Sequence, residues 1–150
     1  MNRFLISFLL ILIGACASQK ATNTTGHTRT KPVQYLDRNT FLLTEVSDDE
    51  TYAFTPKNPV KVGSDDGGGP LNERRFLNAL LGPNGEHVEY YRAGSCCPFK
   101  TPNGLLDNTG LLDRYRVSWQ GAKDTLDIYI NMYDKGDLKI PVGFRAKSKN

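Results

Sequence analysis

The sequence predicts an α+β fold, with an antiparallel sheet of about five or six strands and one helix packed on one face of it. Residues 114–119 and 126–132 alternate apolar and polar side chains, which is typical of half-buried strands joined in a hairpin. Residues 70–81 instead carry apolar side chains at helical spacing. The composition, 39% hydrophobic and 23% charged, is ordinary for one globular domain.

The N-terminal residues predict an export signal. Arg3 supplies a positive charge, residues 4–13 are apolar except for Ser7, and small residues precede Cys16. The apolar run is shorter than the about 20 residues that a transmembrane helix needs. The ending Ile13-Gly14-Ala15-Cys16 resembles the lipobox of bacterial lipoproteins. This resemblance implies cleavage before Cys16 and attachment of diacylglycerol, with acyl chains such as palmitate, to its thiol. The alternative is an ordinary signal peptide with a chance cysteine.

We therefore divide the chain into a lipoprotein signal peptide at residues 1–15, a lipidated cysteine with a flexible polar tether at residues 16–38, and a single globular domain at residues 39–147. Removing residues 1–15 leaves 135 residues and lowers the formal net charge from +3 to +2, because Arg3 is lost. So small a charge predicts no nucleic-acid partner. By analogy with lipoprotein sorting, the lack of an aspartate after Cys16 predicts an outer-membrane anchor that faces the periplasm.

Two strands and the helix are predicted in the first half of the domain. Residues 40–46 and 60–62 are rich in β-forming side chains, whereas residues 51–55 alternate too weakly to distinguish a strand from an ordered loop. Pro70 suits the first turn of a helix, and Gly82-Pro83 ends it.

Glu73 is the most informative charged residue of this helix. At about 100° per residue, it lies in the apolar stripe formed around Phe76 and Leu77. A carboxylate on a buried face is costly unless it is paired. In the next predicted strand, residues 86–93, Arg92 lies on the inward side. The sequence therefore predicts that Arg92 pairs with Glu73.

The second half of the domain is predicted to be all strand. By alternation Tyr115, Val117 and Trp119 point inward in the first strand of the hairpin. Residues 138–144 alternate as well, but Pro141 restricts them to an edge strand or a packed tail.

Cys96 and Cys97 follow the strand at residues 86–93, in the stretch Gly94-Ser95-Cys96-Cys97-Pro98-Phe99. Adjacent side chains in an extended chain point to opposite faces, so alternation predicts one sulfur toward the core and one toward solvent. Their Cα atoms are about 3.8 Å apart, closer than the roughly 4.4 Å at which ordinary disulfides begin. The pair is interpreted as two free thiols, a strained and reducible switch, or part of a metal site. In the redox interpretation, Arg92 would lower the pKa of a neighbouring thiol.

The candidate functional residues are thus Cys96, Cys97, Arg92 and Glu73, besides the lipidation site Cys16. Neither a Cys-x-x-Cys nor a His-x-x-x-His spacing occurs, so we expect no metal site and no cofactor. The sequence identifies no catalytic residue.

Three stretches resemble a family of small lipoproteins from Bacteroidota: residues 69–80, the Gly-Ser-Cys-Cys-Pro-Phe block and residues 129–134. The likeness covers nearly the whole mature domain, and the cysteine block is its most specific part. Members of this family often bear the name 2-dehydro-3-deoxyphosphooctonate aldolase. Enzymes of that chemistry are cytoplasmic barrels of at least about 200 residues, whereas this chain carries a predicted export signal and has 135 residues once the signal is removed.

The sequence favours a membrane-anchored periplasmic lipoprotein that acts as a binding or envelope-assembly module. Its expected partners are the membrane, through the N-terminal lipid, and an envelope protein, and no catalysis is required. The alternative from a different class is a thiol-dependent redox or metal-binding protein centred on Cys96 and Cys97. The aldolase activity is a distant third hypothesis.

Overall fold

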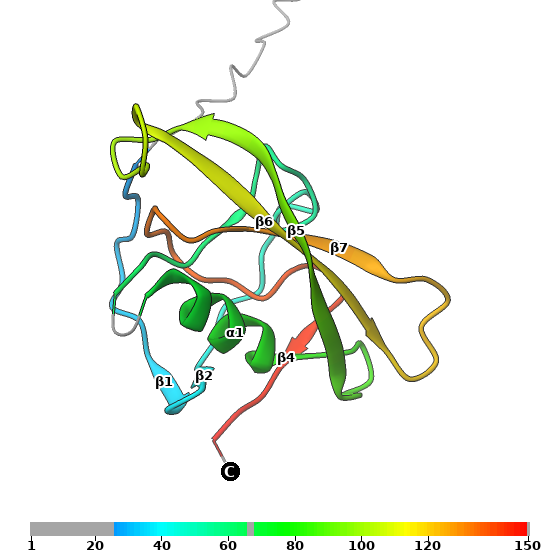
Figure 1. Ribbon diagram of the computed structural model, residues 1–150. Coiled ribbons are helices and arrows are strands. Elements are labelled where there is room, and N and C mark those ends of the chain that lie inside the picture. Colours follow the sequence, from blue (N-terminus) through cyan, green and yellow to red (C-terminus); the bar gives the residue numbers. More distant parts are fainter. Residues whose placement is uncertain (1–25, 66–67, 150) are drawn as a thin grey trace, which may run out of the picture.

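The computed structural model describes residues 26–65 and 68–149, which form one helix and eight strands (Figure 1). The elements are β1 (Tyr35–Asp37), β2 (Thr40–Phe41), β3 (Val60–Lys61), α1 (Gly69–Ala79), β4 (Leu80–Leu81), β5 (Val88–Lys100), β6 (Thr109–Trp119), β7 (Leu126–Asn131) and β8 (Arg145–Ala146). A four-stranded sheet has the order β3-β7-β6-β5, and two small sheets pair β1 with β2 and β4 with β8. The predicted α+β class is confirmed. The predicted signal peptide and Cys16 lie outside the described residues.

The central sheet is mixed, which corrects the predicted antiparallel sheet of five or six strands. β6 and β7 form the predicted antiparallel hairpin, with Val117 opposite Leu126. β3, however, pairs with β7 in parallel, with Val60 opposite Ile130. Parallel neighbours need a long crossover, and here α1, β5 and β6 all lie between β3 and β7 in the chain. A segment as short as Val60-Lys61-Val62 carries no signal for strand direction, so the sequence does not reveal this pairing.

α1 covers one face of the central sheet (Figure 1). Phe76 and Leu77 are fully buried and belong to the same core cluster as Val117, Ile128 and Ile130 of the sheet. Burying an apolar side chain of this size contributes about 1.5–3 kcal/mol. The apolar stripe of the helix and the alternation of the strands therefore predicted both layers of the core.

The helix begins as predicted and ends early. Pro70 occupies its first turn, after Gly68 in the left-handed region at φ 90°. α1 ends at Ala79 because Leu80 takes an extended backbone and begins β4, which pairs with β8. Pairing with the C-terminal strand thus overrides the helical spacing that extended the prediction to Leu81.

Residues 26–38, which the sequence analysis assigned to the flexible tether, lie against the domain; we call them the N-terminal strap. Arg29 donates hydrogen bonds of 2.8–3.2 Å to three backbone carbonyls, those of Lys61, Val62 and Gly136. Asp137 accepts hydrogen bonds from two backbone N–H groups of the strap. The Thr-rich composition is typical of a linker, but these polar contacts hold the segment in place. The folded part therefore includes Gly26 and does not begin at Asn39.

Two other predicted strands are largely irregular. β2 covers only the first two residues of the strand predicted at residues 40–46, and a single parallel bridge joins Val46 to Ile140. Ile140 and Phe144 are buried, so residues 138–144 form the packed tail that Pro141 allowed. Residues 51–55 form turns rather than a strand.

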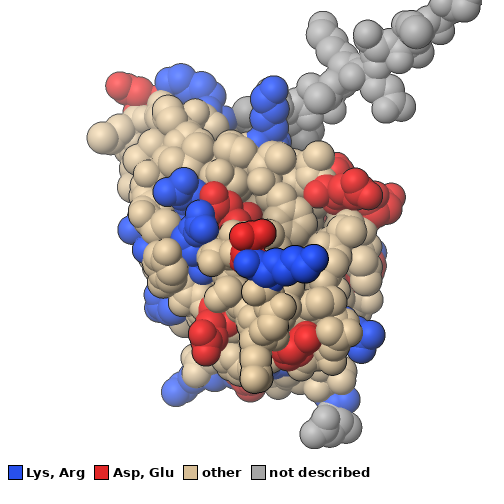
Figure 2. All heavy atoms as spheres, turned by 90° about the vertical axis from the view of Figure 1, so that its right-hand side faces the viewer, with Lys and Arg blue, Asp and Glu red and all other residues tan. Residues whose placement is uncertain are grey.

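Charges of both signs are interspersed on the surface. Figure 2 shows lysine and arginine side chains beside aspartate and glutamate across one face, which agrees with the small net charge. In the described part of the chain, no helix has the length and apolar character needed to cross a membrane.

Candidate functional site

β5 is longer than predicted and carries two bulges. It continues past Ala93 to Lys100 and therefore contains the whole cysteine block. Its register with β6 shifts between Arg92 and Gly94 and again between Cys96 and Pro98, which leaves Ala93 and Cys97 as extra residues. Each extra residue breaks the alternation of side chains between the two faces. The bulges thus decide which side chains meet.

The first bulge brings Arg92 and Ser95 to one carboxylate, that of Asp113 on β6. Arg92 donates to both carboxylate oxygens, with N–O distances of 2.7 Å each, and Ser95 Oγ lies 2.8 Å from Oδ1. The Asp113 side chain is 3% exposed and that of Arg92 is 48% exposed. This hydrogen bonding raises the pKa of Arg92. A buried carboxylate thus has a bidentate arginine that reaches in from the surface.

Arg92 therefore pairs with Asp113, which corrects the predicted pair with Glu73. Glu73 is fully buried, as the helical stripe predicted, and its Oε2 accepts a hydrogen bond of 2.9 Å from the Tyr115 hydroxyl. Its other oxygen, Oε1, is buried without a hydrogen-bond donor. Asp113 was not predicted as a site residue, although it has the same parity as the inward residue Tyr115 and one more step of alternation identifies it.

Burial raises the pKa of Glu73 to about 8, and the neighbouring charge of Asp113 adds to the effect. The hydrogen bond from Tyr115 and the charge of Arg92 oppose the shift without cancelling it. Burial and the Glu73 carboxyl also raise the pKa of Tyr115. The neutral, protonated form of Glu73 is therefore favoured at neutral pH, because burial disfavours the charged carboxylate.

Cys96 and Cys97 form a disulfide. The structure therefore differs from the interpretation as two free thiols and matches the bonded form that the switch interpretation requires. Both residues are half-buried. Cys97 is the extra residue of the second bulge and lies in the left-handed region, at φ 55°. The prediction of one inward and one outward sulfur is wrong, because the bulge breaks the alternation and lets the two adjacent side chains meet.

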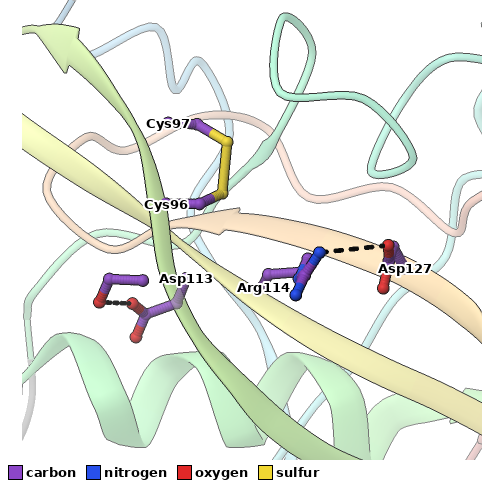
Figure 3. The surroundings of a disulfide bond; sticks show 6 residues. Cys96, Cys97, Asp113, Arg114 and Asp127 are labelled. Atoms are coloured by element: carbon purple, nitrogen blue, oxygen red, sulfur yellow. Dashed lines mark hydrogen bonds and ion pairs between the residues drawn. A yellow bond between two sulfur atoms is a disulfide. The ribbon is translucent and has the colours of Figure 1, made fainter.

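The disulfide lies on the side of β5 away from α1, whereas Asp113 points toward α1 (Figure 3). Cys96 is opposite the buried Leu112, and on β6 Arg114 reaches toward Asp127 with an N–O distance of 3.9 Å. Arg92 is thus bound to Asp113 on the opposite side of the strand. The prediction that Arg92 lowers the pKa of a cysteine thiol loses its geometric basis.

The disulfide can undergo thiol exchange with a dithiol. One thiolate of the dithiol attacks a sulfur of the bond, which forms a mixed disulfide and releases the other cysteine as a thiolate. The second thiolate of the reagent then attacks the reagent sulfur of the mixed disulfide and releases the remaining cysteine. The products are two cysteine thiols here and one disulfide in the reagent. Among residues 26–65 and 68–149, no group of three or more histidine, cysteine, aspartate or glutamate side chains is arranged to hold a metal ion.

No family model matches the chain, and no curated protein or solved structure is significantly similar to it.

Proposed function

We propose that this protein is a lipoprotein, anchored through Cys16 on the periplasmic side of the outer membrane, that works as a binding or envelope-assembly module. The N-terminal pattern of charge, apolar run and Ile13-Gly14-Ala15-Cys16 supports the anchor. The proposal requires no cofactor and no catalytic step.

One observation carries the binding role: Arg92, Cys96 and Cys97 all lie on β5, which is an edge strand. β5 is the last strand in the order β3-β7-β6-β5, so in the described part of the chain it is the edge of the central sheet. An edge strand presents free N–H and C=O groups that can pair with an extended segment of a partner. Residues 91–93 of β5 are exposed, and the Arg92–Asp113 pair fixes the strand behind them.

The anchor is tested by labelling cells with an alkyne analogue of palmitate. Wild-type protein should incorporate the label and partition into detergent, whereas Cys16→Ala should be neither labelled nor cleaved at this site. A Cys96→Ala variant is the matched control and should be labelled like the wild type, because its change lies outside the lipobox. Wild-type protein that remains unlabelled and water-soluble would refute the anchor.

The disulfide supports a second candidate function, a thiol–disulfide switch in the cell envelope. Disulfides persist in oxidising compartments, and a bond between adjacent cysteines closes a very small ring and is readily reduced. In this hypothesis an envelope dithiol reduces Cys96–Cys97 and frees the second bulge of β5 to change shape.

Intact mass distinguishes this candidate. Protein isolated under native conditions with thiols blocked should gain two hydrogen masses on treatment with a dithiol and then accept two alkyl groups per chain. Cys97→Ser should show neither gain and should be alkylated once without reduction. If both cysteines of the native wild type are alkylated before reduction, the switch hypothesis fails, while the lipoprotein proposal stands.

A further inference from the structure

The loop between β5 and β6 carries two adjacent leucines that face solvent. Leu105 is 78% exposed and Leu106 is 79% exposed, and Leu111 at the start of β6 is 42% exposed. Single exposed leucines are ordinary. Here the two leucines are adjacent in the loop that joins β5 to β6. Figure 1 shows this loop at the end of the molecule opposite the C-terminus. We call residues 105–106 the leucine tip.

The loop that presents the leucine tip is well fixed. The carboxylate of Asp134, itself buried, accepts hydrogen bonds from Thr101 Oγ1 at 2.5 Å and from Asn103 Nδ2 at 2.7 Å. Gly104 passes so close to Thr109 that an added Cβ would lie 2.5 Å from backbone atoms. The exposure of the leucines is therefore imposed by a loop whose base is bound to the domain.

The described chain begins beside this loop. A Cβ on Gly26 would lie 3.5 Å from the ring of Pro102, and the ring nitrogen Nδ1 of His27 is 3.4 Å from Asn103 Nδ2. Figure 1 shows the start of the strap and the β5–β6 loop at the same end of the molecule. Gly26 lies ten positions after Cys16, and a chain spans at most about 3.3–3.6 Å per position, or roughly 35 Å here.

We propose that the leucine tip inserts into the lipid surface, at the boundary between headgroups and acyl chains. The domain is then oriented with the loop of its β5–β6 hairpin toward the membrane. The inference rests on the proposed anchor at Cys16, which keeps the domain within reach of the bilayer. Leucine side chains are the type that enters this boundary, and their contribution adds to that of a covalent lipid.

The charges around the tip indicate apolar rather than electrostatic docking. Lys100 donates hydrogen bonds to the Asp107 carbonyl and to Thr109, and Lys135 pairs with Asp65 at 2.7 Å. Asp107 is itself exposed. With charges of both signs around the tip, the depth of insertion should depend little on the content of anionic lipid.

The test uses the full mature chain in vesicles of phosphatidylethanolamine and phosphatidylglycerol that contain a nitroxide-labelled lipid. Leu106→Trp reports on the tip, and Tyr91→Trp is the matched control. Tyr91 is 64% exposed and lies nine residues before Lys100, the end of β5. At roughly 3.3 Å per residue of strand, up to about 30 Å separates Tyr91 from the start of the loop. The native Trp119 signal is measured in the wild type and subtracted.

We expect the emission of Leu106→Trp to shift to the blue and to be quenched by the labelled lipid, while Tyr91→Trp keeps a solvent-like, unquenched spectrum. Equal, solvent-like spectra for both positions would overturn the inference. A blue shift of Leu106→Trp without lipid quenching would overturn it too, since a partner protein or a second copy would then cover the tip. Intact mass of the same sample reports acylation of Cys16, so failure of the anchor is seen separately from failure of tip insertion.

Discussion

Glu73 shows how much of a buried site is visible in a single residue. Its position in an apolar stripe predicted burial correctly, because helical periodicity depends only on sequence spacing. Its partner was predicted wrongly, because a bulge after Arg92 changes which side chains of β5 and β6 face each other. Gly94 is a residue type that often accompanies a bulge, but the predicted strand stopped at Ala93, so the change of register was missed. Alternation alone, extended by one step from Tyr115, would have identified Asp113 as an inward residue.

The raised pKa of Glu73 predicts a pH-dependent stability. The folded pKa of about 8 lies above the unfolded value of about 4.3, so the folded state holds an extra proton between these values. The free energy of unfolding should be highest below about pH 4.3 as far as this group is concerned, and should fall toward pH 8 by at most about 1.4 kcal/mol per pH unit. Urea unfolding of wild type and Glu73→Gln at pH 5 to 9 measures this fall in the free energy of unfolding. The pH range spans the folded pKa of about 8.

Glu73→Gln is neutral at every pH and should remove this part of the slope, so the difference between the two proteins isolates it. Glu50→Gln is the matched control, because Glu50 is exposed. Parallel curves for wild type and Glu73→Gln would mean that Glu73 is already ionised in the folded protein.

At the scale of elements, β5 departs most from its prediction. Gly94 and Pro98 are strand breakers in the sequence, yet β5 runs through both. An edge strand tolerates proline, since the missing N–H can face away from the neighbouring strand, and bulges accommodate the rest. Residues 114–119 of β6 and 126–130 of β7, two strands inside the sheet, follow the predicted alternation, whereas the start of β6 at residues 109–113 was not predicted. The candidate site lies on the element for which alternation fails.

The left-handed backbone of Cys97 predicts an inverted preference between glycine and alanine. In an ordinary strand, glycine is about 0.5–1 kcal/mol less stable than alanine. At φ 55° a residue with a Cβ costs roughly 1–2 kcal/mol more than glycine, so Cys97→Gly should be more stable than Cys97→Ala. Denaturant unfolding of the two variants measures the difference.

The neighbouring position is the control. Cys96→Ala should be more stable than Cys96→Gly, because Cys96 is not among the residues with positive φ. All four variants lack the disulfide, so its loss cancels within each pair. If alanine is preferred at both positions, the second bulge exists only while the disulfide holds it.

For the whole molecule, sequence composition located the domain but not its N-terminal boundary. The core under α1 was predictable because apolar periodicity marks it, whereas the strap is polar and its partners are backbone carbonyls and Asp137. Polar contacts between distant segments leave no periodic pattern in a sequence, so the strap was assigned to the tether. The same contacts hold residues 26–38 against the domain, and the first described residue, Gly26, lies beside Pro102 of the β5–β6 loop.

Two truncations test this boundary. A chain that starts at Gly26 should unfold cooperatively, with the stability of the mature chain. A chain that starts at Asn39 lacks Arg29, which donates to three backbone carbonyls, although the Lys61 carbonyl keeps the Gly136 N–H as a second donor. Hydrogen bonds to charged groups contribute about 1.5–3 kcal/mol each, so this chain should lose at least about 3 kcal/mol, a large part of the roughly 5–15 kcal/mol that stabilises a domain. Arg29→Ala in the longer chain should reproduce part of the loss. Urea unfolding followed by circular dichroism measures all three, and equal midpoints for the two truncations would return the start of the domain to Asn39.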